Sequence, residues 1–325
     1  MNIQTINRVK YAVLTGGSIT KEEALLLVNT ENKSEFYAAA NEIREFFKGN
    51  IFDVCSIENA KSGACSEDCK WCSQSAHNNA DVDVYEMVDS KKAVEMAKRN
   101  ENYGVKRYSL VTSGRAVSNK NIDKLCDTYL DIRKESDISF CASMGLLNKE
   151  KLEKLKNVGI EHYHCNLESS RRFFPKVCST HTYDEKIETI KIAQELGIKI
   201  CSGGIIGMGE NMEDRIDMAY ELANLGVQSI PINILNPVEG TPLKKASKLN
   251  KHEILSSIAI IRFICPNANL RFAGGRNTMK SFQEEALHAG INSAVVGDML
   301  TTTGSSGVEE DLKNFRKAGF EISKR

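Results

Sequence analysis

Residues 195–205, ELGIKICSGGI, show the pattern that decides the fold of this chain. A helical stretch ends at a glycine, an apolar residue follows, and a short strand begins. The same pattern recurs in NYGVKRYSLV (102–111), NVGIEHYHCNL (157–167), NLGVQSIPINIL (224–235) and HAGINSAVVG (288–297). Each glycine suits a left-handed helix C-cap, because glycine has no Cβ to clash in that conformation. The chain therefore repeats a helix–turn–strand unit.

This repeat predicts eight strands with helices between them. The strands are expected near 51–57, 107–112, 138–144, 161–167, 198–205, 228–235, 268–273 and 292–297. Helical patterns lie at 121–135, 148–157, 184–196, 212–225, 250–264 and 278–289. Regular alternation of strand and helix indicates a parallel sheet. Eight units predict an α/β fold, a (β/α)8 TIM-type barrel with its active site at the carboxyl ends of the strands. An open doubly wound sheet is the alternative.

Residues 1–50 carry helical signals of their own. Thr20 and Glu23 have the spacing of a capping box ahead of the apolar run ALLLV, and 33–48 is amphipathic up to Gly49. A further helix is expected at 308–322. We therefore expect an N-terminal helical extension at 1–50 and a barrel with a C-terminal cap at 51–325.

Composition excludes several classes of partner. Lysine plus arginine and aspartate plus glutamate both number 43, so no basic excess favours nucleic acid or an anionic membrane surface. The N-terminus lacks the apolar core of a signal peptide, and no apolar run is long enough to span a membrane. These features predict a cytoplasmic protein. Its ten cysteines are then expected to be thiols, metal ligands or catalytic groups rather than disulfides.

The segment CSEDCKWC (65–72), directly after the first predicted strand, carries the clearest chemical signal. Its thiols Cys65, Cys69 and Cys72 can bind three irons of a cubane cluster. Iron–sulfur clusters are ordinarily held by four cysteines, so the fourth iron stays open to a small molecule. The competing interpretation is half of a structural zinc site. Zinc prefers paired knuckles, and the only close candidate for a fourth ligand is His77.

The cysteine loop resembles the signature of radical S-adenosylmethionine enzymes, with Trp71 as the aromatic residue before the last cysteine. GGIIGMGE (203–210) resembles the glycine-rich segment that lies beside the adenine in that superfamily. The resemblance implies a 4Fe–4S cluster whose open iron binds S-adenosylmethionine. It also assigns Gly203, Gly207 and Glu210 to the cofactor site.

The resemblance narrows to the biotin synthase family and covers nearly the whole chain. The matching segments are SGACSEDCKWCSQS (62–75), VTSGR (111–115), THTYDEK (180–186), GIKICSGGIIGMGE (197–210), PINILNPVEGTPL (231–243), LRFAGGR (270–276) and GDMLTTTGSS (297–306). It implies sulfur insertion into desthiobiotin by a 5′-deoxyadenosyl radical, with the sulfur taken from an auxiliary cluster inside the barrel. It further implies an electron donor such as flavodoxin or ferredoxin, and a homodimer.

The resemblance assigns residue roles, with no side chain acting as a catalytic acid or base. Cys65, Cys69 and Cys72 match the ligands of the first cluster. Three further residues match cofactor contacts, namely Asn166, Glu168 and His181. The substrate contacts are matched by Asn166, Asn233, Thr301 and Thr302. An amide such as Asn233 can both donate and accept hydrogen bonds, which suits the cyclic urea of desthiobiotin.

The auxiliary cluster is where this chain departs from the family pattern of three strand cysteines and one arginine. Cys141, Cys201 and Arg271 match three of those positions, but Ser109 occupies the fourth, and a serine oxygen is a poor partner for iron. Two extra thiols, Cys165 and Cys178, are candidate replacements. The chain thus resembles the variant of anaerobes with a four-iron auxiliary cluster, and a 2Fe–2S cluster is the alternative. We predict that Cys165, on a strand between those of Cys141 and Cys201, is a ligand and that Ser109 is not.

The remaining cysteines, Cys55, Cys126 and Cys265, are interpreted as core residues, the usual role of free cysteine. Another radical S-adenosylmethionine enzyme with a similar barrel, of the hydrogenase-maturation or methylornithine synthase type, is the nearer alternative function. A ferredoxin-like carrier or a zinc-stabilised binding protein is the alternative from another class, although neither needs a large barrel.

Overall fold

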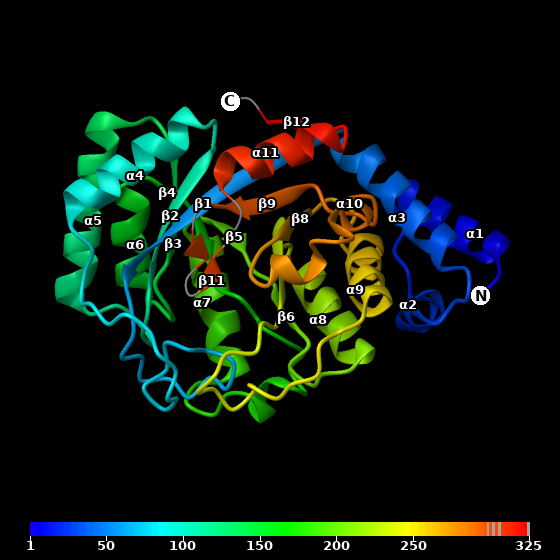
Figure 1. Ribbon diagram of the computed structural model, residues 1–325, viewed down its shortest axis with the longest axis horizontal. Coiled ribbons are helices and arrows are strands. Elements are labelled where there is room, and N and C mark those ends of the chain that lie inside the picture. The colour runs from blue at the N-terminus through cyan, green and yellow to red at the C-terminus, as the bar shows by residue number, and fades with distance from the viewer. Residues whose placement is uncertain (298, 301–302, 305–306, 324–325) are drawn as a thin grey trace.

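The centre of this computed structural model, which describes residues 1–297, 299–300, 303–304 and 307–323, is a parallel barrel (Figure 1). Its wall consists of β1 (Ile51–Lys61), β2 (Arg107–Thr112), β3 (Ser139–Ser143), β4 (Ile160–His164), β5 (Lys199–Cys201), β6 (Gly204–Ile206), β7 (Ser229–Ile234), β8 (Asn269–Phe272) and β9 (Ser293–Val296). The last strand, β9, pairs with β1, where Asp53 lies opposite Ser293, so the sheet closes on itself. The predicted (β/α)8 barrel is confirmed, and the open sheet is excluded.

The fifth predicted strand divides into β5 and β6, which share one position in the wall. β5 pairs with β4 and β7, and β6 pairs with β7 further along. Between them, a Cβ on Gly203 would lie 2.0 Å from the carbonyl oxygen of Pro231. The two backbones are thus too close for a side chain, and glycine is the residue that permits such an approach.

Helices cover the outside of the barrel: α4 (Ser90–Asn102), α5 (Asn119–Glu135), α6 (Lys149–Asn157), α7 (Tyr183–Glu195), α8 (Met212–Asn224) and α9 (Lys251–Ile264). Gly104, Gly159, Gly197 and Gly226 end four of them with φ between 64° and 91°, as their C-cap role requires. The helix α4 was not among the predicted ones. The helix predicted at 278–289 is instead a 3₁₀ turn, η2 (Arg276–Met279), followed by the short α10 (Gln283–Leu287).

Three helices precede the barrel: α1 (Ile3–Leu14), α2 (Lys21–Val28) and α3 (Lys33–Lys48). They pack beside α8 and α9 at one side of the molecule (Figure 1), through a separate apolar cluster that includes Phe36 and Phe263. The capping box of Thr20 and Glu23 at the start of α2 is confirmed. In the part of the chain that the structure describes, no helix combines the length and apolar character needed to cross a membrane.

The predicted C-terminal helix is α11 (Val308–Lys317), which ends earlier than expected. It is followed by β12 (Glu321–Ile322), which pairs with the start of β1. The ring of Phe315 on α11 stacks on Phe52 of β1, with ring centroids 4.1 Å apart. A two-stranded hairpin, β10 (Met299–Leu300) with β11 (Thr303–Gly304), precedes α11.

Successive side chains of a strand point to opposite sides of the wall. On β1, Phe52 and Val54 belong to the large apolar core shared with the helices, whereas Cys55 and Ile57 pack with Ala273 and Val295 inside the barrel. The barrel interior is therefore lined by every second strand residue. This alternation decides which polar strand residues can meet one another.

Candidate functional site

A cavity of about 440 Å³ opens at the carboxyl ends of the strands. It is lined by the three thiols of the cysteine loop and by several of the predicted cofactor and substrate residues. Those residues are Cys65, Cys69, Cys72, His164, Cys165, Asn166, Glu168, His181 and Asn233. The structure thus brings together side chains that are up to 168 residues apart in the sequence.

The cysteine loop is held in shape by its own backbone. The Cys65 N–H donates to the Gln74 carbonyl at 3.0 Å, and the Ala76 N–H donates to the Cys65 carbonyl at 2.8 Å. The amide of Asn78 donates to the carbonyls of Cys69 and Cys72, at 3.2 and 2.8 Å. Because these bonds fix the main chain, the three thiols are presented on one side, toward the cavity.

A second loop, which follows β4, docks onto the cysteine loop. Asp68 accepts hydrogen bonds from the N–H groups of Ser179 and Thr180 at 2.8 and 3.2 Å. Glu67 accepts from the Thr180 hydroxyl at 2.8 Å and lies 2.5 Å from Nδ1 of His181. The predicted cofactor residue His181 is therefore positioned by a carboxylate of the cysteine loop.

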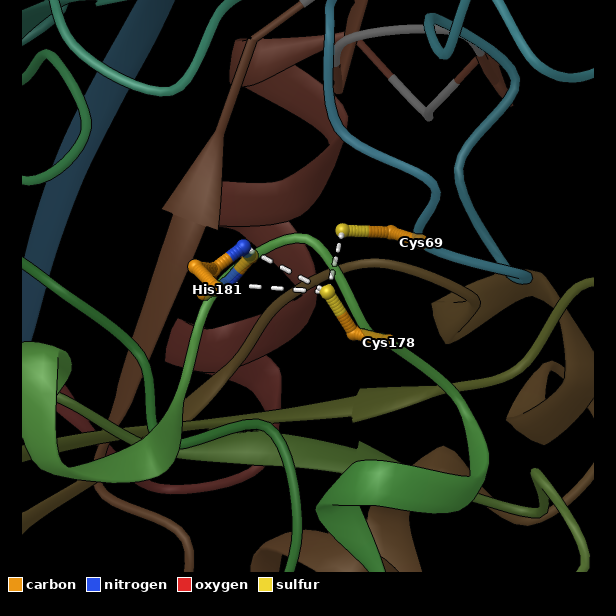
Figure 2. Close-up of side chains that lie close together, drawn as sticks. All are labelled: Cys69, Cys178 and His181. Carbon is orange, nitrogen blue, oxygen red and sulfur yellow. Dashed lines mark hydrogen bonds between the residues drawn. The ribbon is translucent and has the colours of Figure 1, made fainter.

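This docking places Cys178 beside Cys69 (Figure 2). Their Sγ atoms are 3.7 Å apart, and Nδ1 of His181 lies 3.4 Å from Sγ of Cys178. The hydrogen bond with Cys69, and then His181, lower the pKa of Cys178 against the opposing effect of burial. Among the described residues, this is the only group of three such ligand atoms that lie within 4.8 Å of one another. The structure thus places Cys178 next to the first cysteine loop.

Glu168 combines backbone strain with an unpaired carboxylate oxygen. Its φ is 72°, a left-handed conformation that is costly for a residue with a side chain and is concentrated at functional sites. Its Oε2 is buried and has no hydrogen-bond partner among the described residues. Burial is the main cause that raises the pKa of Glu168. The carboxyl group is therefore available to a ligand in the cavity.

Two asparagines beside Glu168 bind the backbone of the glycine-containing strand ends. Oδ1 of Asn166 accepts from the Gly203 N–H at 3.1 Å. Oδ1 of Asn233 accepts from Gly274 N–H at 2.8 Å, and its Nδ2 donates to the Gly204 carbonyl at 3.2 Å. Each amide keeps unused hydrogen-bonding capacity, because an amide offers two donors and two acceptor lone pairs.

Glu210 has a different setting from the other predicted cofactor residues. Its carboxylate accepts from the N–H groups of Gly207 and Met208, both at 2.7 Å, and from Nε of Arg215 at 2.8 Å. These bonds shape the turn that follows β6. Gly207 and Glu210 lie outside the set of described residues that line the cavity. Thr301 and Thr302, the predicted carboxylate-binding pair, lie outside the described residues.

Below the cavity, the barrel interior holds Cys141, Cys201 and Arg271. Sγ of Cys201 lies 3.2 Å from Oγ of Ser229, which in turn lies 3.4 Å from Nε of Arg271. The other interior candidate, Ser109, pairs in register with Cys141, and its buried hydroxyl has no hydrogen-bond partner among the described residues. The structure therefore brings three of the predicted auxiliary ligands together, with an unsatisfied polar group beside them.

The structure does not bring Cys165 into this interior group. It lines the cavity at the barrel mouth, and its thiol lies 3.9 Å from the carbonyl oxygen of Lys186 on α7. The register explains the position, because His164 and not Cys165 lies opposite Cys201. One residue along a strand reverses the side to which the side chain points.

Several residues at the site were given no role by the sequence analysis. Glu67, Gln74, Arg115 and Lys186 line the cavity, and they lie in segments that match the family without an assigned role. Cys55 is also at the interior site, where Nη1 of Arg271 donates to its sulfur at 3.3 Å. Asp53, two residues before Cys55 on the same face of β1, also binds Arg271, a contact that no local sequence pattern predicts.

The residues present fit the groups that the resemblance implies. Three thiols face the cavity as a cluster with an open iron requires, and the unpaired carboxylate oxygen of Glu168 suits a hydroxyl donor. Burial raises the pKa of Cys72 to about 11, and burial also raises the pKa of Cys141 and Cys201. These thiols would lose their protons when they bind iron, because the ligand is the thiolate.

The chain matches two family models. Residues 60–222 match the radical SAM superfamily, where SAM is S-adenosylmethionine, and residues 231–321 match the biotin and thiamin synthesis associated domain. Among solved structures, the chain resembles a methylornithine synthase with a TM-score of 0.83 at 17% identity, over 97% of both chains. It resembles a maturase of the FeFe-hydrogenase with a TM-score of 0.84 at 20% identity, over 100% of this chain and 76% of the other. These structures share the fold.

Curated relatives are much more similar in sequence. The chain is 49% identical to a biotin synthase of Parabacteroides distasonis over 98% of both chains. It is also 49% identical to a biotin synthase of Clostridium botulinum, over 98% of this chain and the full length of the relative. The chain therefore belongs to the biotin synthase family of the radical SAM superfamily.

Proposed function

We propose that the protein inserts sulfur into desthiobiotin to form the thiophane ring of biotin. The observation that carries this proposal is the stacking of two thiol groups along one barrel. Three thiols of the cysteine loop face the cavity at the barrel mouth, and Cys141 and Cys201 lie in the interior below it. A substrate in the cavity would have a radical source on one side and a sulfur source on the other.

Cys65, Cys69 and Cys72 hold the 4Fe–4S cluster in this proposal, and S-adenosylmethionine binds its open iron. When bound, these two groups supply a 5′-deoxyadenosyl radical that removes hydrogen from an unactivated carbon, chemistry that no side chain provides. The cavity walls orient both ligands and exclude water. The cluster requires a reductant, for which flavodoxin or ferredoxin is proposed, and a cytoplasmic homodimer is the proposed state.

The side chains around the cavity account for recognition of both ligands. Glu168 offers its unpaired oxygen to the ribose hydroxyls of the cofactor, and Asn166 lies between cofactor and substrate. Asn233 uses one donor and one acceptor on the backbone of Gly204 and Gly274. These bonds fix the orientation of the Asn233 amide. Its second N–H can then donate to the carbonyl of a ureido ring, and its second lone pair can accept from a ureido N–H.

The auxiliary cluster is proposed to lie in the interior beside Cys141, Cys201 and Arg271. The four-iron type is favoured, with a 2Fe–2S cluster as the alternative. The position of Cys178 supports a role beside the first cluster, since its sulfur lies 3.7 Å from that of Cys69. Ligation by Cys165 is the competing assignment, and the experiment in the next subsection tests it directly.

An anaerobic assay tests the proposed function. The reconstituted protein is incubated with desthiobiotin, S-adenosylmethionine and a reductant, and biotin and 5′-deoxyadenosine are quantified. The wild type should form both products. The double variant Cys69→Ala/Cys178→Ala should form neither, because Cys178, whose sulfur lies 3.7 Å from that of Cys69, can then no longer replace the third thiol of the loop. Cys126→Ala, on the partly buried side of α5, is the control and should keep both activities.

Metal analysis separates this proposal from a zinc protein. The trio Cys69, Cys178 and His181 has the geometry to hold a single metal ion, and zinc accepts such ligands. Zinc at about one ion per chain with little iron, in protein isolated without oxygen, would contradict the proposal. A wild-type protein that holds its clusters but cleaves S-adenosylmethionine without forming biotin would also contradict it.

A further inference from the structure

The interior of the barrel contains one layer made of three thiols and a guanidinium. Cys55 comes from β1, Cys141 from β3, Cys201 from β5 and Arg271 from β8. Because β5 and β6 share one position in the wall, these are its first, third, fifth and seventh positions. Interior side chains of (β/α)8 barrels stack in layers of four that come from alternate strands. The four residues are therefore one complete layer.

Contacts within the layer connect Cys55, Arg271 and Cys201. Arg271 donates from Nη1 to the sulfur of Cys55 at 3.3 Å, and its Nε reaches Ser229, the hydrogen-bond partner of Cys201. Cys141 comes from β3, the alternate strand between β1 and β5 in the wall. Each member is at most 3% exposed.

The three sulfurs of the layer do not form a site for a single metal ion. In the part of the chain that the structure describes, only Cys69, Cys178 and His181 bring three ligand atoms within 4.8 Å of one another. The three thiols of the layer are thus more widely spaced than a single ion requires. Arg271 is held in place by Asp53, whose Oδ2 lies 2.5 Å from its Nη2. Its guanidinium therefore stays fixed beside the sulfur of Cys55.

Neither of the competing residues belongs to this layer. Ser109 lies on β2, which is not one of the alternate strands that supply this layer. Cys165 lies just beyond the end of β4, where it lines the cavity and contacts the Lys186 carbonyl. A thiol at Cys55 can therefore replace the missing thiol at Ser109 from the adjacent strand.

We propose that Cys55 is the third thiolate ligand of the auxiliary iron–sulfur cluster, together with Cys141, Cys201 and Arg271. This inference rests on the proposed function only in requiring that an auxiliary cluster exists. It restores a set of three cysteines and one arginine in a chain that has serine at position 109. It applies to either nuclearity of the cluster.

The experiment compares cysteine variants by their iron content after anaerobic reconstitution. Wild type should bind about eight irons with two cubanes, or about six with a two-iron auxiliary cluster. Cys55→Ala should retain only about four, the first cluster, and its Mössbauer and absorption spectra should lose the auxiliary component. It should still form 5′-deoxyadenosine but no biotin. The conservative variant Cys55→Ser tests whether loss of volume alone causes the effect, and it should also lose the auxiliary cluster.

Two matched control variants each replace a buried cysteine that lies outside the layer. Cys265 is 6% exposed and its thiol bonds the Ala219 carbonyl, and Cys165 is 7% exposed and contacts α7. Cys265→Ala and Cys165→Ala should keep the iron content of wild type. The intact first cluster in each variant reports that the barrel is folded.

Three results would overturn the assignment. They are full iron content in Cys55→Ala, loss of the auxiliary component in Cys165→Ala, and a wild-type protein that holds only the first cluster. Failure of the wild type to form biotin while it holds both clusters is a different result. It would contradict the proposed function and leave the ligand assignment of Cys55 supported by the iron counts.

Discussion

At the scale of single residues, the amide of Asn233 is the best-defined substrate contact. Backbone bonds to Gly204 and Gly274 fix its orientation, so its remaining donor and acceptor are preorganised. Replacing it with alanine would leave polar groups of the ureido ring unpaired, at a cost of about 1–3 kcal/mol, or roughly 5- to 150-fold in affinity. We expect Asn233→Ala to weaken desthiobiotin binding by that factor in equilibrium titration. Unchanged affinity would place the ureido ring elsewhere.

Glu58 predicts a pH dependence of stability. Burial beneath the strand–helix layer raises its pKa from 4.5 to about 7. The native state therefore binds a proton that the unfolded state has released, and stability falls as the pH rises from about 4.5 to about 7, by at most about 3 kcal/mol. Glu58→Gln should flatten this decline in thermal melts recorded between pH 5 and pH 8. The exposed Glu86→Gln should melt as wild type does, and an equally steep decline in Glu58→Gln would contradict the assignment.

At the scale of elements, the close approach of the β5–β6 connection to β7 limits which residue can occupy position 203. A Cβ on Gly203 would lie 2.0 Å from the Pro231 carbonyl, so Gly203→Ala must push two strands apart. We expect a loss of about 1–3 kcal/mol in unfolding free energy, the usual cost of overpacking. Gly307→Ala is the matched control, because nothing lies within 4 Å of the added Cβ. Equal unfolding free energies of the two variants in urea would show that β7 moves aside without a loss of stability.

The docking of two loops makes a second prediction at this scale. Asp68 joins the cysteine loop to the loop after β4 through the N–H groups of Ser179 and Thr180. Without these bonds the first cluster should be lost faster to a chelator, by about fivefold if about 1 kcal/mol of loop anchoring disappears. Asp68→Ala should show this in the decay of cluster absorbance. Asp83→Ala is the control, and identical decay rates would mean that the docking does not protect the cluster.

At the scale of the whole molecule, the clusters join segments that the chain topology leaves separate. The first spans a loop after β1, and the auxiliary cluster would link β1, β3, β5 and β8. A ligand that binds only the native state raises its stability, so anaerobic removal of both clusters should lower the melting temperature by several degrees. The large apolar core does not depend on iron, and circular dichroism at 20 °C, roughly room temperature, should keep its helical signal. A chelated protein that melts as the holoprotein does would contradict this.

The sequence alone determined those features that depend on residues close to one another along the chain. The C-cap glycines and the capping box of Thr20 and Glu23 act within one turn, so their pattern predicted the barrel. The spacing of Cys65, Cys69 and Cys72 predicted the first cluster loop for the same reason, since all three thiols lie within one short segment. The family and the fold therefore followed from local signals repeated along the chain.

Only the tertiary structure decided which distant residues meet. Strand register and the alternation of side chains brought Cys55 into one layer with Cys141, Cys201 and Arg271, although the sequence suggested a core role for it. The same alternation turned Cys165 toward α7, and loop docking carried Cys178 to Cys69. A shift of one residue in a strand exchanges inside for outside, and no local pattern contains that information.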